Sequence, residues 1–159
     1  MASPTMSYLI CSMALIVLIL VLPSFFEIQR NSIADEMTRR ELTEIADYTS
    51  DTLANLFFLA ESAQSSAISL TKELMYLPLT VGDSFYVLRI DDDGNSPKVI
   101  AYIKDQQWIS GQSWVAPSLD VDPEISVEIN SHELNAKIAV ASCYGDPGNF
   151  YVSLGYNEK

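Results

Sequence analysis

The distribution of apolar and charged residues divides the chain into three stretches. No Asp, Glu, Lys, Arg or His stands before Glu27, and the residues from Ser7 to Phe26 read SYLICSMALIVLILVLPSFF. A helix needs about 20 mainly apolar residues to cross the hydrocarbon core of a bilayer. A signal peptide would have a shorter apolar stretch, a preceding positive charge and a small-residue cleavage site. The pattern therefore predicts a retained transmembrane anchor over residues 1–26, in which Pro23 can bend the helix without ending it.

The second stretch, residues 27–77, predicts a long amphipathic helix. It contains neither proline nor glycine, and its apolar residues recur in alternating steps of four and three, as in a heptad repeat. We expect one face of this helix to be buried, either against the chain's own sheet or against another copy of the chain. The residues of the repeat are Leu42, Ala46, Thr49, Leu53, Leu56, Ala60, Ala63, Ala67, Leu70, Leu74 and Leu77, and the packing or self-association face is expected at Leu53, Leu56, Ala60, Ala63, Ala67, Leu70 and Leu74.

The third stretch, residues 78–159, changes to a period of two, which is typical of strands. Residues 84–90 and 98–103 predict a hairpin around the turn DDDGNSP, and residues 124–130, 134–141 and 150–156 predict three further strands. Residues 106–123 are expected to form a long connection or to contain a short edge strand.

The pattern as a whole predicts an α+β protein. A long N-terminal helix, first transmembrane and then amphipathic, would pack on a small antiparallel β-sheet of about five strands, because so small a sheet needs another layer to cover its apolar face. The expected divisions are an anchor at 1–26, an amphipathic helix at 27–77 and a β domain at 78–159.

Charge excludes one class of partner. The chain has 159 residues with 9 Lys+Arg against 21 Asp+Glu, which gives a formal net charge of −12. Nucleic-acid binding needs a basic surface that neutralises phosphates, and the sequence offers none. No nucleic-acid partner is expected.

Few residues could carry catalysis. The one histidine, His132, falls in an expected turn, where it is most often a solvated side chain. Cys11 lies inside the expected span and Cys143 near the end of a strand, so no disulfide between them is expected. Because catalysis needs a positioned acid, base, nucleophile or metal, we expect neither an enzyme nor a cofactor.

One acidic turn could bind a cation. Asp91, Asp93 and Asn95 offer alternate oxygen ligands, as calcium-binding loops do. However, Ser96 and Tyr102 stand where an EF-hand loop requires glycine and glutamate. A plain acidic hairpin turn is the preferred interpretation, and Asp91, Asp93 and Asn95 stay weak metal candidates.

The layout of an apolar N-terminal helix, an amphipathic continuation and a small β domain resembles that of type IV pilins. The start Ala2-Ser3-Pro4-Thr5-Met6, directly before the apolar run, is similar to the cleavage region of archaeal pilin-like proteins, and Pro23 stands where pilin helices often bend. The resemblance implies a β domain outside the cell and a helix that packs with copies of itself or with related subunits. An archaellum accessory protein, in which an uncleaved helix anchors a stator-like extracellular β domain, has a similar layout.

Two classes of function follow from these observations. The first is a structural or assembly subunit of a cell-surface filament or complex, with membrane lipid and either copies of itself or related pilin-like subunits as partners. The second is a membrane-tethered β domain that binds a ligand or acts as a sensor. The arginines Arg30, Arg39 and Arg40 follow the span, and the positive-inside rule would place that side in the cytoplasm. The resemblance instead implies an extracytoplasmic C-terminal domain in a single-pass membrane protein.

Overall fold

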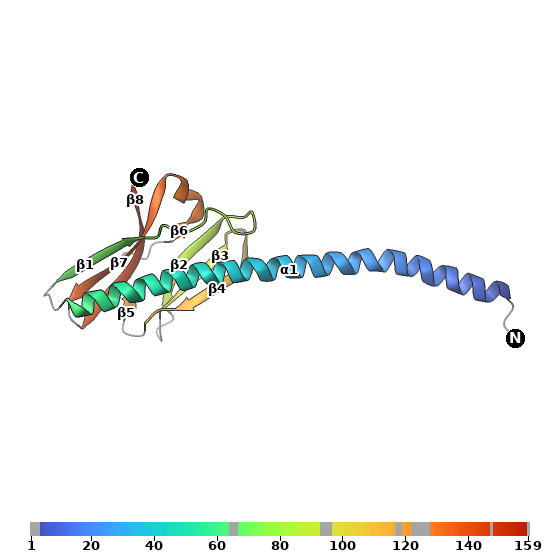
Figure 1. Cartoon of the computed structure of the whole chain (residues 1–159), viewed down its shortest axis with the longest axis horizontal. Helices are drawn as coiled ribbons and strands as arrows, with labels where there is room; N and C mark the ends of the chain where they lie inside the picture. Colours follow the sequence, from blue (N-terminus) through green and yellow to red (C-terminus); the bar gives the residue numbers. More distant parts are fainter. Residues whose placement is uncertain are drawn as a thin grey trace. The chain divides into compact units, whose positions relative to one another are not determined.

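The computed structural model describes residues 4–63, 67–92, 97–116, 119–121, 128–146 and 148–158 (Figure 1). Its helices and strands are α1 (Pro4–Ser62), β1 (Ile68–Glu73), β2 (Tyr86–Asp92), β3 (Pro97–Ile103), β4 (Gln106–Trp114), β5 (Leu119–Val121), β6 (Ile129–Asn130), the 3₁₀ helix η1 (Ser131–Asn135), β7 (Lys137–Asp146) and β8 (Asn149–Glu158).

The chain divides into two units, Met1–Glu36 and Met37–Lys159. The described part of the first unit is helical throughout, and α1 continues through Pro23. The second unit contains the rest of α1 and all the described strands.

The strands of the second unit form two four-stranded sheets. One sheet has the order β1-β7-β8-β5 and the other β4-β3-β2-β6. All pairs are antiparallel except that of β5 with β8. The predicted α+β class with a long N-terminal helix on a mainly antiparallel β structure is confirmed, although the described strands number eight rather than about five.

The hairpin predicted around the acidic turn is confirmed, since β2 and β3 pair in register from Tyr86 opposite Ile103 to Asp92 opposite Pro97. The strand predicted at 150–156 corresponds to β8. Residues 106–123 contain β4 and β5, so more of this stretch is strand than a short edge strand requires. The strand predicted at 134–141 begins later, at Lys137, because η1 occupies residues 131–135. Of the strand predicted at 124–130, residues 124–127 lie outside the described residues and β6 covers the last two.

The prediction of a helix as far as residue 77 is wrong. The helix α1 ends at Ser62, where the Ser62 hydroxyl donates a hydrogen bond of 2.8 Å to the carbonyl of Leu59. Serine side chains compete with helical hydrogen bonds in this way, and four serines stand between positions 62 and 69. Leu70, a position of the heptad repeat, also fits a period of two with Ile68, and β1 forms there.

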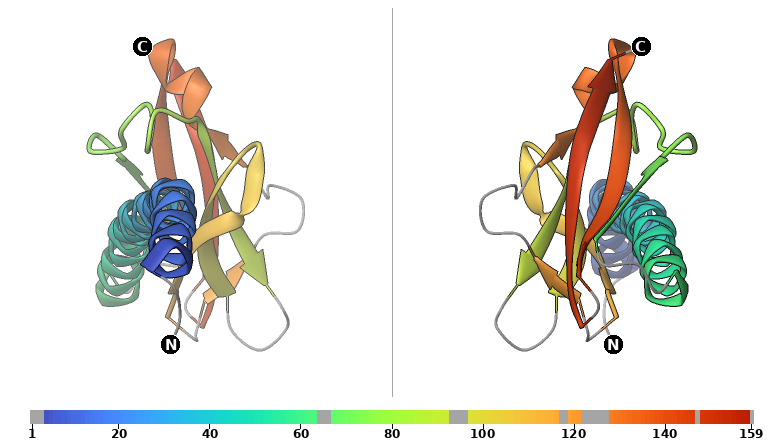
Figure 2. Two further views of the ribbon diagram at one scale, coloured as in Figure 1. Left: turned by 90° about the vertical axis from the view of Figure 1, so that its right-hand side faces the viewer. Right: turned by 90° about the vertical axis from the view of Figure 1, so that its left-hand side faces the viewer.

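The hydrophobic core lies where residues 42–60 of α1 meet both sheets. Figure 2 shows the part of α1 that belongs to the second unit on one side of the strands. The helix contributes Leu42, Ala46, Leu53 and Leu56 to the core. The β1-β7-β8-β5 sheet contributes residues such as Cys143, which is buried in the same cluster. The second sheet adds Leu88, Val99, Ala101 and Ile129. One face of the helix therefore serves as the common cover of two sheets.

The helix also holds the outer edge of the sheet that contains β4. The Arg39 guanidinium donates a hydrogen bond of 2.9 Å to the carbonyl of Trp108, and the Ser50 hydroxyl donates one of 2.5 Å to the carbonyl of Trp114. Between them, Gly111 lies against the helix backbone: a Cβ atom there would be 2.5 Å from the carbonyl carbon of Leu42 and 2.6 Å from the Cα of Thr43. Only glycine allows this contact.

We expect Gly111→Ala to destabilise the protein by about 1–3 kcal/mol or more, because the added methyl group would overlap backbone atoms that cannot rotate away. Gly155→Ala is the matched control, since its Cβ would lie 3.7 Å from Cγ2 of Val140, an ordinary contact. Thermal unfolding of the full-length chain in detergent, followed by circular dichroism, measures both. Equal melting temperatures for the two variants would contradict the close approach of α1 and β4.

Candidate functional site

The first unit presents apolar side chains to its surroundings. The described large apolar side chains between Met6 and Ile33 are exposed, with fractions from 43% at Leu22 to 80% at Tyr8. Within the described residues, α1 is the one helix that is long and apolar enough to cross a membrane, and the apolar segment has no cover from the rest of the protein. A helix that is apolar on all sides is typical of a bilayer environment.

The residues expected on the packing or self-association face differ in burial. Leu53, Leu56 and Ala60 are buried on α1, with exposed fractions of 5% or less. Leu70 lies on β1 and is half-buried, and Leu74 is buried directly after that strand. The remaining two, Ala63 and Ala67, lie beyond the end of α1 and are exposed, so their expected burial is wrong. The heptad positions after residue 62 were accidental, because the chain there no longer follows a helical period.

The acidic turn contributes one described candidate. Asp91 lies on β2, where its carboxylate is 3.8 Å from the Arg89 guanidinium and 4.0 Å from the Lys98 ammonium. Asp93 and Asn95 lie outside the described residues. Within the described part of the chain, no three His, Cys, Asp or Glu side chains come together as a metal site.

The histidine and the two cysteines have different surroundings. His132 is exposed on η1, and its ring meets Phe85 edge to face at 5.0 Å between centroids. Cys11 is exposed in the first unit, whereas Cys143 is fully buried on β7. Burial raises the pKa of the Cys143 thiol, which keeps it protonated and unreactive at neutral pH.

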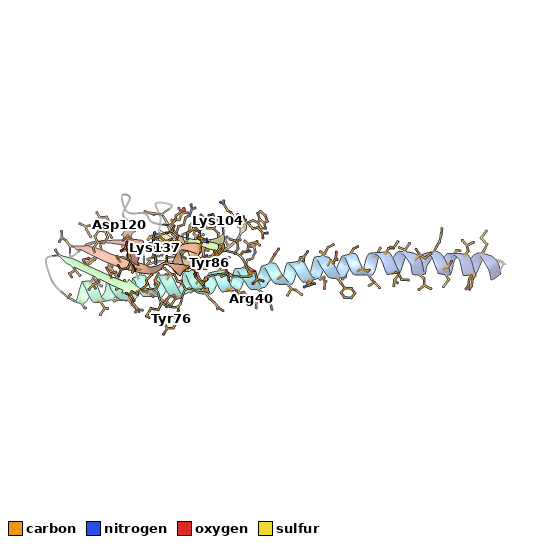
Figure 3. The ribbon with its side chains drawn as sticks, turned by 90° about the horizontal axis from the view of Figure 1, so that it is seen from above. Arg40, Tyr76, Tyr86, Lys104, Asp120 and Lys137 are labelled. Carbon is orange, nitrogen blue, oxygen red and sulfur yellow. The ribbon has the colours of Figure 1, made fainter. Side chains whose placement is uncertain are left out.

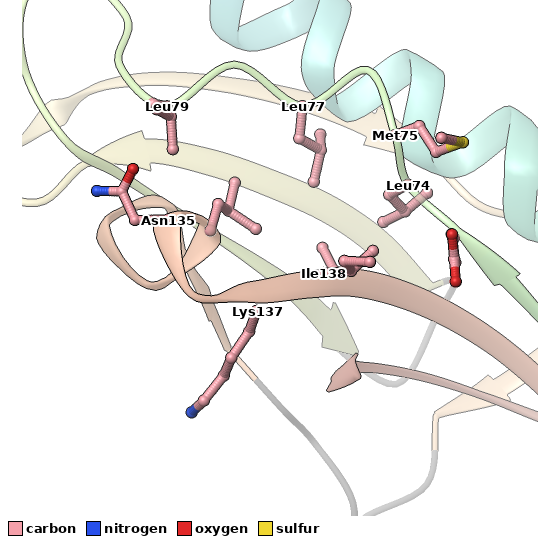
Figure 4. Close-up of a pocket in the computed structure, with 10 residues that line it drawn as sticks. Leu74, Met75, Leu77, Leu79, Asn135, Lys137 and Ile138 are labelled. Atoms are coloured by element: carbon pink, nitrogen blue, oxygen red, sulfur yellow. The ribbon is translucent and has the colours of Figure 1, made fainter. Parts of the chain in front are cut away.

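One grooved surface of the second unit surrounds the segment 74–80, which follows β1. It separates two open grooves. The first groove, of about 380 Å³, lies between this segment and the start of β7, and Figure 4 shows Leu77 and Leu79 pointing across it toward the β7 ribbon. The other apolar residues of its lining are Leu74, Met75, Leu134, Ile138 and Ala139, and the polar ones are Glu73, Asn135 and Lys137.

The second groove, of about 460 Å³, lies between the same segment and α1. Tyr76, Pro78 and Thr80 form one wall, Leu77 borders both grooves, and the α1 wall consists of Glu41, Glu44, Ile45 and Tyr48. The rings of Tyr48 and Tyr76 meet edge to face, with 5.9 Å between their centroids. Figure 3 shows Tyr76 on the side of the domain where α1 lies.

The segment 74–80 is held in place along its length. The Leu74 amide donates a hydrogen bond of 2.8 Å to the carbonyl of Ala139, and the hydroxyl of Tyr86 donates one of 2.8 Å to the carbonyl of Pro78. The Tyr86 side chain is fully buried, and this burial raises its pKa far above the ordinary value for tyrosine. A neutral hydroxyl donor therefore fixes the middle of the segment over the whole range of physiological pH.

Sequence reasoning missed this surface, because it assigned Leu74 and Leu77 to the heptad repeat. Pro78 was the available signal: the residue before a proline is disfavoured in a helical conformation, so a helix that includes Leu77 was improbable. The burial of Tyr86 beneath the segment is a tertiary contact that no local pattern indicates.

Comparison with protein-family models, curated proteins and solved structures found no match to this chain.

Two alanines on the expected face differ in burial, and this difference gives a matched test. We expect Ala60→Glu to destabilise the protein by about 3 kcal/mol or more, because it forces a carboxylate and extra volume into a site with 1% exposure. We expect Ala63→Glu to change stability by less than about 0.5 kcal/mol, because that position is exposed. Thermal unfolding in detergent compares them, and a large loss from Ala63→Glu would contradict the end of α1 at Ser62.

Proposed function

We propose that this chain is a single-span, membrane-anchored subunit that resembles pilins and serves a structural or assembly role in a cell-surface filament or complex. One observation carries the proposal, namely the apolar helical segment of the first unit whose side chains the protein itself leaves uncovered. Exposing so many large apolar side chains to water would be unfavourable, and lipid or neighbouring helices would cover them.

The packing of the second unit limits which surfaces could make assembly contacts. The face of α1 that the heptad pattern marks is used inside the domain, where it covers both sheets. Contacts between copies would therefore involve other surfaces, including the first unit, where Ile28 and Ile33 are exposed beyond the expected span. The proposed partners are membrane lipid and copies of this chain or related subunits.

We place the second unit outside the cytoplasm in this proposal. The pilin-like layout favours that side, whereas the positive-inside rule, applied to Arg30, Arg39 and Arg40 after the span, favours the cytoplasm.

Anchoring and orientation can be tested with one reporter cysteine. In a Cys11→Ser background, Lys72→Cys places a thiol on an exposed position of β1, while buried Cys143 serves as an internal control. We expect a membrane-impermeant maleimide to label position 72 in intact cells and to label Cys143 only after denaturation. We also expect the chain to stay in the membrane during carbonate extraction. Labelling of position 72 only after cell lysis would reverse the orientation, and release by carbonate would refute the anchor.

Association of copies can be tested in native membranes. In the same Cys11→Ser background, we expect Ile28→Cys to form disulfide-linked dimers of this chain on mild oxidation, because this exposed apolar position lies in the first unit. Asn55→Cys, exposed on α1 in the second unit, is the matched control and is expected to crosslink less. If the chain is recovered only as a monomer from both variants, with no crosslinked related subunit, the assembly role fails.

A further inference from the structure

We propose that the surface around segment 74–80 is a docking site for a basic amphipathic helix of another protein. This surface, called here the two-groove surface, consists of segment 74–80 and the two grooves beside it. It goes beyond the proposed function, because it lies entirely within the second unit and does not depend on the membrane anchor.

The first argument is apolar exposure on a fixed support. Met75 is 76% exposed, Tyr76 83% and Leu79 43%, and all three belong to one segment. Exposed apolar side chains are common singly, but a contiguous group beside grooves marks interaction sites. Because hydrogen bonds to the carbonyls of Ala139 and Pro78 hold the segment, a partner would not have to order it on binding.

The second argument is shape. The side chains of the segment alternate, so Met75 and Leu79 line the groove beside β7, whereas Tyr76 and Pro78 line the groove beside α1. The segment therefore forms an apolar ridge with a channel on each side. An amphipathic helix can lay its apolar stripe along such a ridge and insert side chains at helical spacing into both grooves.

The third argument is charge, and it selects the kind of helix. Glu41 and Glu44 line the groove beside α1, and Glu73 lines the other. These three carboxylates form no ion pair with the described part of the chain. Lys137, the one cation among the residues that line either groove, is paired with Glu133 at 2.7 Å, and Figure 4 shows its side chain directed away from the groove.

Two other occupants fit this charge less well. An anionic lipid surface would be repelled by the same carboxylates. A second copy of this chain carries 21 acidic against 9 basic residues, so most of its surface offers the wrong sign. A helix with Lys or Arg beside its apolar stripe complements both the ridge and the acidic walls.

Site-specific photo-crosslinking tests the proposal on the full chain in nanodiscs of zwitterionic lipid. The probe is a peptide of about 18 residues, long enough for five helical turns, with leucine on one face and lysine on the other. The photoreactive residue p-benzoylphenylalanine replaces Met75, or, as the control, the exposed Trp114 of β4. Crosslinking reports binding at the site itself, independently of any partition of the peptide into lipid.

We expect the peptide to crosslink from position 75 and not from position 114. We expect Tyr76→Ser to reduce the yield about tenfold, and the pair Glu41→Gln and Glu44→Gln to reduce it several-fold and to weaken its dependence on salt. The pair Asp105→Asn and Glu158→Gln, two exposed acidic residues outside both grooves, is the matched charge control and is expected to have no effect. Unchanged melting temperatures will show that the variants fold.

Several results would overturn the proposal. These are equal crosslinking from positions 75 and 114, equal crosslinking of a leucine–glutamate peptide, or insensitivity to the Tyr76 and glutamate substitutions. Crosslinking of position 75 to a second copy of this chain in place of the peptide would make the surface a self-interface. In cells that produce the chain, the segment captured from position 75 should combine Lys or Arg with apolar residues at helical spacing; an acidic segment or lipid would contradict the proposal.

Discussion

The close contact of α1 with both sheets is the constraint on which the second unit depends. Each sheet has only four strands, and no other helix among the described elements provides a layer for its apolar face. Residues 42–60 of α1 supply that layer to both sheets at once, through a single buried cluster. At one point the contact is so close that Gly111 leaves no space for a side chain. The residues along this one face of α1 must therefore pack against both sheets at the same time.

The same contact has a polar part, which concerns an edge strand. An unpaired strand edge offers free backbone groups to other chains. Here β4 is the outer strand of its sheet, and side chains of α1 bond to two of its carbonyls, those of Trp108 and Trp114. The helix therefore covers part of an edge that would otherwise be open to pairing. Both tryptophan side chains stay exposed, so the protection comes from the backbone contacts.

The fold class could be predicted from the sequence because periodicity is a strong signal over long stretches. The apolar run before Glu27 and the heptad positions from Leu42 to Ala60 are helical, as their patterns predict, and the heptad positions are buried. The prediction fails from Ala63 onward, where Leu70 fits a period of 3.5 with Leu74 and Leu77 and also a period of two with Ile68. Local pattern could not decide between them, because β1 exists through its pairing with β7, more than sixty positions away along the chain. The two-groove surface was missed for the same reason, since the buried ring of Tyr86 determines the path of segment 74–80.

The pairing of β1 with β7 also sets an order of events during synthesis. Ile68 lies opposite Gly145, and β8 completes the same sheet with the last described residues of the chain, whereas β2, β3 and β4 are joined by short connections. Short loops close at a lower entropic cost than long ones, so the β2-β3-β4 sheet can form against α1 while later residues are still being made. The other sheet cannot be completed until the ribosome has released residues 149–158. Until then, part of the apolar face of α1 has no strands to cover it. In the nascent chain, this exposed apolar surface is prone to aggregation.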